Sequence, residues 1–401
     1  MDRIAKTGRL GWIWRPGDRK SAWLGAILIG VSVIYLIGEV DVALAPGAGP
    51  PLGDFFALWS YARIVLAHPA ADLYDFARLH AAQVALGMPD ADYNPFPYPP
   101  TFLLLILPLG LLSFHAAYAV WMAATVPLYL LAICAAVRNK RAAVCVALLA
   151  PATTACLVAG QSGFLLAALQ VGGLRLVPWR PVLAGVLFGL LTYKPQFGLL
   201  VPVALVAGGQ WRSVAAACAT AAGLLLVTSA AFGATIWWSW LHALPAYALL
   251  FDRDMVGHPL MPTVLENLQA LGVAPGVAWV AQMAATITAG IIAWAAWRRL
   301  PHALAVPAVI AATCLATPHA FVYDLPMLSG AAILFAAERL QARGALVLPE
   351  LGTLILVLAI PLAMTMHGVH APVGAAVIAL FAALVMADGQ RTARWPGGLS
   401  G

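Results

Sequence analysis

Long runs of apolar residues, separated by short polar segments, recur along the chain from Ser21 to Met386. A helix that crosses a bilayer needs about 20 predominantly apolar residues, and fewer where the protein shelters its ends. The pattern therefore predicts an all-α polytopic membrane protein with a single transmembrane domain over residues 21–387. The expected spans, about twelve in number, are residues 21–39, 115–137, 142–159, 162–177, 181–193, 196–208, 213–233, 275–297, 303–316, 325–338, 345–366 and 371–387.

Basic residues indicate how these spans are threaded, because lysine and arginine accumulate on the cytoplasmic side of a membrane. Six basic residues precede the first apolar run, and further basic clusters recur between later runs. We therefore expect both termini to be cytoplasmic, as the segments 1–20 and 388–401. Residues 39–114 and 234–274 then form two long outer loops. This threading leaves four of the 22 basic residues outside, but eleven of the 16 acidic ones.

Two segments depart from the simple pattern of spans. Residues 100–113 are apolar, but they are few and Pro108 interrupts them. A crossing there would place the next basic cluster outside, so we expect this segment to lie in or dip into the outer leaflet. The first apolar run, residues 21–38, is longer than the apolar region of a signal peptide, which has about 7–15 residues. We expect it to be a retained span, although residues 43–45 resemble a cleavage site.

The polar turns between some spans predict a cavity that opens outward. Two pairs of spans turn at residues 159–161 and 193–196. The spans beside the second turn have only about 13 residues, or about 20 Å of helix, whereas the hydrocarbon core is about 30 Å thick. Irregular backbone at that depth is tolerated only where it lines a cavity or is buried in protein. In the first outer loop, residues 54–67 and 76–86 are expected to form short interfacial helices.

Composition supports the membrane assignment and excludes several classes of function. Hydrophobic residues make up 63% of the chain and charged residues 9%, whereas a soluble domain has about 25% charged residues. The net charge of +6 follows from the topology and does not indicate a nucleic-acid partner. The alanine-rich, lysine-poor composition favours a bacterial protein of the plasma membrane, with membrane lipids as its surroundings. The five cysteines lie in apolar runs without metal-ligand spacing, so we expect them to be packing residues.

Two ionisable residues near the outer turns are the main candidates for chemistry. Asp54 follows a Pro/Gly-rich linker and opens the first outer helix. It can cap that helix by accepting backbone N–H groups, act as a general base, or do both. Lys194 is the only lysine after Lys140. An ionisable group at membrane depth indicates function, here the binding of a phosphate, although the side chain could instead extend to the outer headgroups.

Several neutral or titratable residues are expected on the same side. His319 follows Thr317-Pro318 at an outer turn and could contact a phosphate or be an ordinary hydrogen-bonded polar group. Gln161 and Gln196 could donate to a phosphate or cap helix turns. Possible substrate contacts are Arg63, which could also bind lipid headgroups, Tyr98, which begins a stiff extended Tyr-Pro-Pro segment, and Tyr323. The sequence contains no nucleotide-binding motif. It also offers no cage for a metal, because a lone aspartate makes a poor divalent site, so we expect no cofactor.

Six short motifs occur in a fixed order between residues 20 and 335. They are Asp54-Phe55-Phe56-Ala57-Leu58-Trp59, Asp72-Leu73-Tyr74-Asp75, Phe96-Pro97-Tyr98-Pro99-Pro100, Gly160-Gln161, Lys194-Pro195-Gln196 and Thr317-Pro318-His319. Together they resemble glycosyltransferase family 87, within the membrane-embedded GT-C class. The resemblance implies a bundle of many helices with an outward cavity. It also implies a polyprenyl-phosphate-mannose donor, or arabinofuranose in some members.

The same resemblance suggests roles for individual residues. Asp54 matches the family's catalytic aspartate, and His319 matches a histidine near the donor. Residues 261–267 match the family's second outer loop only loosely, so the identity of the acceptor stays open. We expect an inverting transfer of a sugar, mannose, to a lipid-linked or glycan acceptor on the outer face. Donor-phosphate binding is assigned to Lys194, His319, Gln161 and Gln196.

Two other classes of function remain as alternatives. A secondary transporter or lipid-glycan flippase often contains internal repeats, and none is evident in this sequence. A non-catalytic membrane scaffold would have no need of a cavity. The polar turns that converge on one side of the membrane favour the enzyme.

Overall fold

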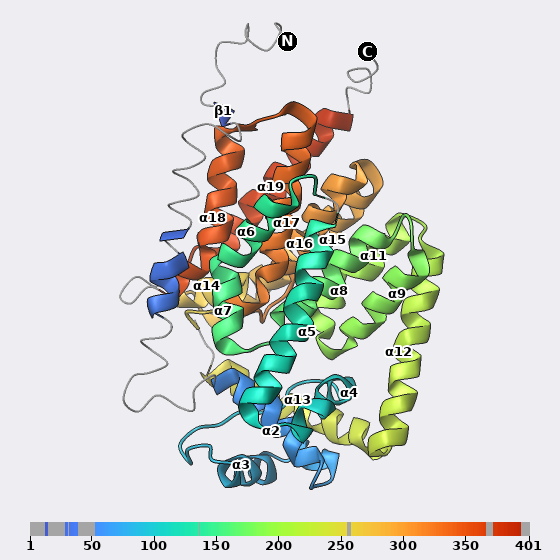
Figure 1. The fold of residues 1–401 in the computed structure, drawn as a ribbon, viewed down its shortest axis with the longest axis vertical. Coiled ribbons are helices and arrows are strands. Elements are labelled where there is room, and N and C mark those ends of the chain that lie inside the picture. The colour runs from blue at the N-terminus through green and yellow to red at the C-terminus, as the bar shows by residue number, and fades with distance from the viewer. Residues whose placement is uncertain are drawn as a thin grey trace, which may run out of the picture.

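The computed structural model describes residues 13–14, 29–30, 32–38, 53–135, 137–254, 258–365 and 372–393, and most of them are helical (Figure 1). The predicted all-α class is confirmed. The described strands, β1 (Ile13–Trp14) and β2 (Leu346–Val347), form one short antiparallel pair. The predicted cytoplasmic segments 1–20 and 388–401 and the first span are described only in part. Within that span, residues 29–30 and 32–38 are helical.

The predicted first outer loop forms a compact group of short helices at one end of the molecule, the lower end in Figure 1. Its elements are α2 (Gly53–Val65), η2 (Ala70–Tyr74), α3 (Phe76–Ala85), α4 (Thr101–Ile106) and η3 (Leu107–Leu111). Asp75 starts α3 because its carboxylate accepts hydrogen bonds from two backbone N–H groups of the first turn. The helices predicted for residues 54–67 and 76–86 are thus confirmed as α2 and α3.

The short apolar segment 100–113 packs against α2. Gly110 lies so close that an added Cβ would be 2.6 Å from the backbone of Ala62. The indole of Trp59 donates a hydrogen bond to Leu112 O at 3.0 Å. Two short helices, α4 and η3, make up most of this segment.

Three of the described helices, α5 (Phe114–Cys134), α12 (Trp211–Phe232) and α15 (Pro275–Arg299), are each long and apolar enough to cross a bilayer. A fourth crossing is possible if α6 (Lys140–Leu149) and α7 (Pro151–Ala159) form one span, with a 57° bend between them. The other predicted spans correspond to shorter or less apolar helices, and the total of twelve stays a prediction. These helices are α8 (Gly163–Leu176), α9 (Pro181–Leu190) with η4 (Leu191–Tyr193), α10 (Pro195–Gly198) with α11 (Leu200–Ala207), α16 (His302–Ala316), α17 (Pro326–Arg343), α18 (Leu348–Thr365) and α19 (Gly374–Ala393).

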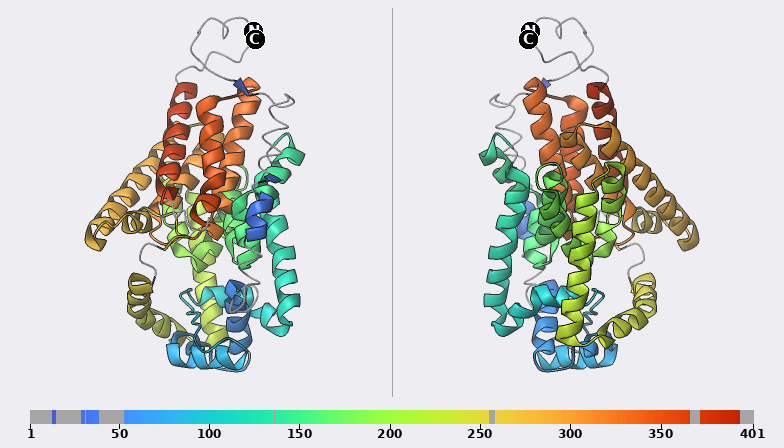
Figure 2. Two further views of the ribbon diagram at one scale, coloured as in Figure 1. Left: turned by 90° about the vertical axis from the view of Figure 1, so that its left-hand side faces the viewer. Right: turned by 90° about the vertical axis from the view of Figure 1, so that its right-hand side faces the viewer.

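Burial separates a central layer of helices from a rim. Every residue of α16 from Leu304 to Ala316 is buried, as expected for a helix that is apolar all round. By contrast, α12 and α15 expose large apolar side chains such as Leu226 and Ile287. In a membrane protein such surfaces face the lipid, and α12 stands at one edge of the bundle in Figure 1 and α15 at one edge in Figure 2.

Helix α19 continues past residue 387, where the last span was expected to end. Asp388 is buried in it and forms an ion pair with Arg339 of α17 at 3.0 Å. The end of α19 and strand β1 lie at the end of the molecule opposite α2 and α3 (Figures 1 and 2). Helices α2 and α3 and these near-terminal segments therefore lie at opposite ends of the bundle.

The predicted second outer loop contributes two more helices, one of which lies beside the predicted first outer loop. Helix α13 (Thr235–Asp254) runs beside η2, and α14 (Val264–Ala270) packs on α15. The loop after residue 257 also contacts the segment before α17, because Val322 N donates to Leu260 O at 2.9 Å. These contacts bring the two outer loops and the 317–324 segment together.

Candidate functional site

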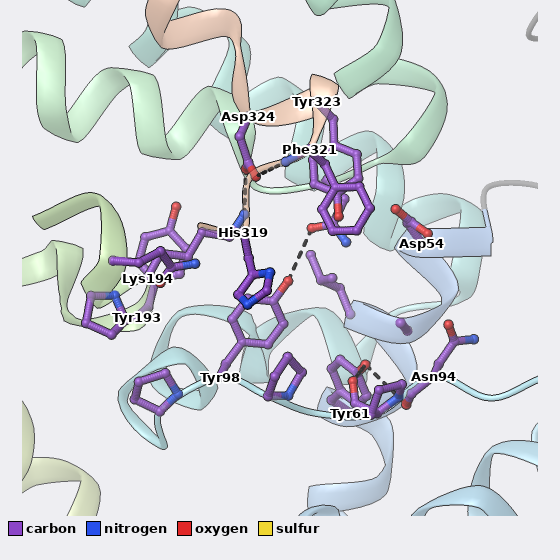
Figure 3. A pocket seen from close by; sticks show the side chains of 18 of the residues that line it. Asp54, Tyr61, Asn94, Tyr98, Tyr193, Lys194, His319, Phe321, Tyr323 and Asp324 are labelled. Atoms are coloured by element: carbon purple, nitrogen blue, oxygen red, sulfur yellow. Dashed lines mark hydrogen bonds and ion pairs between the residues drawn. The ribbon is translucent and has the colours of Figure 1, made fainter. Parts of the chain in front are cut away.

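A cavity of about 570 Å³ lies where these segments meet the helices of the bundle (Figure 3). Its walls come from α2, the 93–99 loop, α13 and the 258–260 and 318–324 segments, together with the two predicted polar tips. Asp54, Tyr98, Gln161, Lys194, Gln196, His319 and Tyr323 all line it. The structure thus brings seven of the eight residues selected from the sequence to one cavity.

The tip between α7 and α8 holds Gln161 against both α2 and the 317–324 segment. Gly160 has φ +66° and lies so near α2 that an added Cβ would be 2.4 Å from Phe55 Cβ. Across the tip, a Cβ on Gly163 would be 1.8 Å from Tyr323 O. Only glycine permits both approaches. The tip therefore packs tightly between these two segments, and this packing positions the side chain of Gln161 next to Asp54.

Gln161 connects two groups of the cavity. Its side-chain oxygen accepts a hydrogen bond from Tyr98 Oη at 3.4 Å and another from Ser162 N at 3.3 Å. Its side chain also hydrogen-bonds to Asp54, for which the amide N–H remains as the donor. Gln161 is 6% exposed. This places it with the aspartate, whereas the sequence had suggested a contact with the donor phosphate.

Asp54 lies in the first turn of α2, one residue after the helix begins, and is half-buried. Desolvation by the surrounding protein raises the pKa of Asp54 from its ordinary value to about 6. The hydrogen bond from Gln161 and the charge of Lys194 lower the pKa, and the charge of Asp324 raises it. A carboxyl group with this pKa is mostly ionised at neutral pH and accepts a proton more readily than an ordinary aspartate.

Lys194 forms the opposite side of the site and is not a free cation. Its Nζ lies 2.6 Å from Asp324 Oδ1, and the two side chains are 6% and 4% exposed. Desolvation lowers the pKa of Lys194, but neighbouring groups, Asp324 first among them, raise it, and the net result is a pKa above the ordinary value. The ammonium therefore stays charged beside the cavity. Figure 3 shows Asp54 and Lys194 reaching the cavity from different elements, with Tyr98 and His319 between them in the view.

Aromatic rings cover the wall between Lys194 and the 258–260 loop. Phe321 and Tyr323 stack with centroids 4.9 Å apart, and the rings of His258 and Phe321 form a T-shaped pair with centroids 5.4 Å apart. His258 Nδ1 accepts a hydrogen bond from Leu260 N at 3.2 Å, and burial lowers the pKa of His258. The ring is therefore neutral at pH 7, with its proton on Nε2.

The remaining predicted residues lie in different surroundings. His319 is half-buried on the cavity wall, and its ring forms a T-shaped pair with Trp279, with centroids 6.1 Å apart. Gln196 is half-buried in α10 beside Lys194. Arg63 does not line the cavity; it is exposed, and its Nη1 donates to Gly110 O at 2.9 Å. It therefore fastens η3 to α2.

Sequence reasoning missed two residues of the site, Asp324 and His258. Asp324 directly follows Tyr323 in the sequence, but nothing next to it indicates a partner. Its distance of 130 residues from Lys194 gave no local signal for a pair. His258 had no partner that could be named from the sequence. Within the described ranges no cluster of three or more His, Cys, Asp or Glu side chains could hold a metal ion.

Comparison with known proteins places the chain in a family. A model of glycosyltransferase family 87 matches residues 96–322, more than half of the chain. The matched segment contains Tyr98, Gln161, Lys194, Gln196 and His319, while Asp54 precedes it and Asp324 follows it. No curated protein and no solved structure gave a significant match.

Proposed function

Because the chain belongs to glycosyltransferase family 87, we propose that it transfers a sugar, mannose, from a polyprenyl-phosphate donor to a lipid-linked or glycan acceptor with inversion. Family membership indicates a membrane-embedded glycosyltransferase. The donor, sugar and acceptor are the proposed part. The observation that carries the proposal is one cavity lined by both Asp54, with a pKa of about 6, and the charged Lys194.

Asp54 is the proposed general base. The acceptor hydroxyl gives its proton to the Asp54 carboxylate while its oxygen attacks the anomeric carbon of the donor. The bond from that carbon to the phosphate oxygen breaks, and its electron pair leaves with the polyprenyl phosphate. Gln161 holds the Asp54 carboxylate in place through its amide. A single displacement of this kind inverts the anomeric centre.

Lys194 and His319 are the proposed partners of the donor phosphate, with Gln196 as a neutral donor beside them. Cations and N–H groups stabilise the negative charge that develops on the leaving phosphate. The polyprenyl phosphate is already an activated leaving group, so the transfer requires no nucleotide fold. Tyr98 and Tyr323, which line the cavity between the two ends, are proposed substrate contacts.

The proposed orientation has the cavity facing outward from the plasma membrane of a bacterium, with both termini cytoplasmic. The basic clusters of the sequence support it, because lysine and arginine accumulate on the cytoplasmic side. Helix α2 and the end of α19 lie at opposite ends of the molecule, which agrees with this threading. The lipid tail of the donor would then lie in the outer leaflet, beside the cavity.

The test is a transfer assay with purified protein and labelled polyprenyl-phosphate mannose. The wild-type protein is expected to label an acceptor extracted from the host membrane. The Asp54→Asn variant keeps the size of the side chain but removes the base, so we expect its kcat to fall by about 10²–10⁴-fold. Near wild-type transfer by Asp54→Asn would remove Asp54 from the mechanism. Transfer from a different polyprenyl-linked sugar, and not from the mannose donor, would correct the sugar.

A further inference from the structure

The charge at the Lys194 end of the cavity is already balanced before any substrate binds. Asp324 Oδ1 lies 2.6 Å from Lys194 Nζ, and Asp324 Oδ2 accepts a hydrogen bond from Phe321 N at 3.2 Å. Both members of the pair line the cavity (Figure 3). The carboxylate is thus fixed by two partners from different segments. A phosphate that approaches Lys194 also meets the negative charge of Asp324.

That negative charge affects the two phosphates of the reaction differently. The donor is a phosphodiester with a single negative charge. After transfer, the leaving group is a phosphomonoester, whose charge near neutral pH is about −1.5 to −2. An unpaired ammonium in a site of low dielectric would therefore hold the product more tightly than the donor. A carboxylate within ion-pair distance of that ammonium opposes most strongly the species with the larger negative charge.

We infer that Asp324 is a positioning residue that weakens the hold of Lys194 on lipid phosphate, so that the polyprenyl monophosphate product leaves the cavity. The inference rests on the proposed function, because that function places the donor phosphate at Lys194. Asp324 acts through Lys194 and need not touch the substrate. The same carboxylate fixes the Phe321 backbone, and therefore the aromatic wall formed by Phe321 and Tyr323.

The direct test measures binding of a short-chain polyprenyl monophosphate to purified protein in detergent. The Asp324→Asn variant removes the charge but keeps an oxygen that accepts from Phe321 N. We expect it to bind the monophosphate at least about fivefold more tightly than the wild type, the lower end of typical coupling between sites. In the transfer assay, the monophosphate should inhibit Asp324→Asn at correspondingly lower concentrations. The Asp324→Glu variant, which keeps the charge, should restore the wild-type affinity.

A gain of affinity separates this role from a structural one, because a distorted site would bind more weakly. Unchanged or weaker binding by a folded Asp324→Asn protein would overturn the inference. The wild type provides the control for the proposed function. If it neither binds the monophosphate nor transfers sugar, the proposed function fails; if it does both and Asp324→Asn binds no tighter, only the role of Asp324 fails.

A second pair of variants covers the case in which Asp324→Asn does not fold, since a buried cation without its partner destabilises a protein. The comparison is between Lys194→Met and the double variant Lys194→Met/Asp324→Leu, which leaves no buried charge at the pair. We expect the double variant to bind the monophosphate more tightly than Lys194→Met, because the repelling carboxylate is absent. Equal or weaker binding by the double variant would contradict the inference.

Discussion

The Lys194 ammonium and the Asp324 carboxylate lie 2.6 Å apart and are almost inaccessible to solvent, although 130 residues separate them in the chain. The pair ties the tip before α10 to the segment before α17, and both segments line the cavity. A buried pair costs desolvation energy that its own attraction does not always recover. The position of the pair at the cavity indicates a role in the candidate site more than in the stability of the fold.

Replacement of Lys194 by methionine is expected to weaken use of the donor. A hydrogen bond to a charged group contributes about 1.5–3 kcal/mol, so the donor KM should rise on the order of 10- to 100-fold. Loss of the Lys194 charge raises the pKa of Asp54, so the acceptor KM should change little only when it is measured well above pH 6, where Asp54 is ionised in both proteins. Steady-state kinetics with each substrate varied in turn measure the difference.

The matched control for this variant is Lys140→Met. Lys140 is exposed at the start of α6 and does not line the cavity. The unfolding temperature of both variants should be measured in detergent, because Lys194→Met leaves the Asp324 carboxylate buried without its cation. An unchanged donor KM in a folded Lys194→Met protein would refute the phosphate role of Lys194.

The activity should depend on pH through the ionisation of Asp54. A base must be deprotonated to act, and the pKa of Asp54 is raised to about 6. Activity is therefore retained above this pH and lost as the pH falls through it. We expect kcat/KM to decrease by about tenfold per pH unit below pH 6. A profile that stays flat down to pH 5 would mean that Asp54 is not the base.

The decrease of kcat/KM below pH 6 is the acidic limb of the pH profile. The hydrogen bond from Gln161 should determine the pH at which this limb lies. It lowers the pKa of Asp54, so its removal in Gln161→Leu should move the limb of kcat/KM to higher pH. Gln196→Leu is the control, because Gln196 lines the cavity at the Lys194 tip and should affect donor KM but not the limb. If the two variants gave the same profile, Gln161 would not position Asp54.

The sequence allowed the helices to be predicted, and it indicated that the candidate residues lie together, because the relevant signals are local. Runs of apolar residues mark helices, and basic clusters mark one side of a membrane. The outer helices α2 and α3 and the gathering of Asp54, Lys194 and His319 follow from those signals. Their common cavity agrees with the threading that the basic residues indicated.

The contacts between distant segments could not be predicted in the same way. No local pattern shows that Asp324 meets Lys194, or that His258 lies beside Phe321. The span predicted for residues 142–159 is two helices with a 57° bend. The sequence does carry one local signal for that break, because Pro151 lies in the first turn of α7 and proline favours the start of a helix. The span predicted for residues 196–208 is likewise divided, into the short helices α10 and α11.

Gly163 should be irreplaceable at the tip that carries Gln161. An added Cβ would lie 1.8 Å from Tyr323 O, so either α8 or the 317–324 segment must move in Gly163→Ala. Overpacking of this kind costs about 1–3 kcal/mol, and here it also shifts Gln161 and Tyr323 relative to Asp54. We expect a lower unfolding temperature in detergent together with a loss of transfer activity.

Gly172→Ala is the matched control for Gly163→Ala, because Gly172 lies in the same helix. A Cβ at Gly172 would meet its nearest neighbour, Ala132 Cβ, at 3.5 Å, an ordinary contact. Alanine also favours a helix over glycine by about 1 kcal/mol. Gly172→Ala should therefore be at least as stable as the wild type and fully active. If Gly163→Ala behaved like Gly172→Ala, the close packing of the α7–α8 tip against Tyr323 could not be what holds Gln161 beside Asp54.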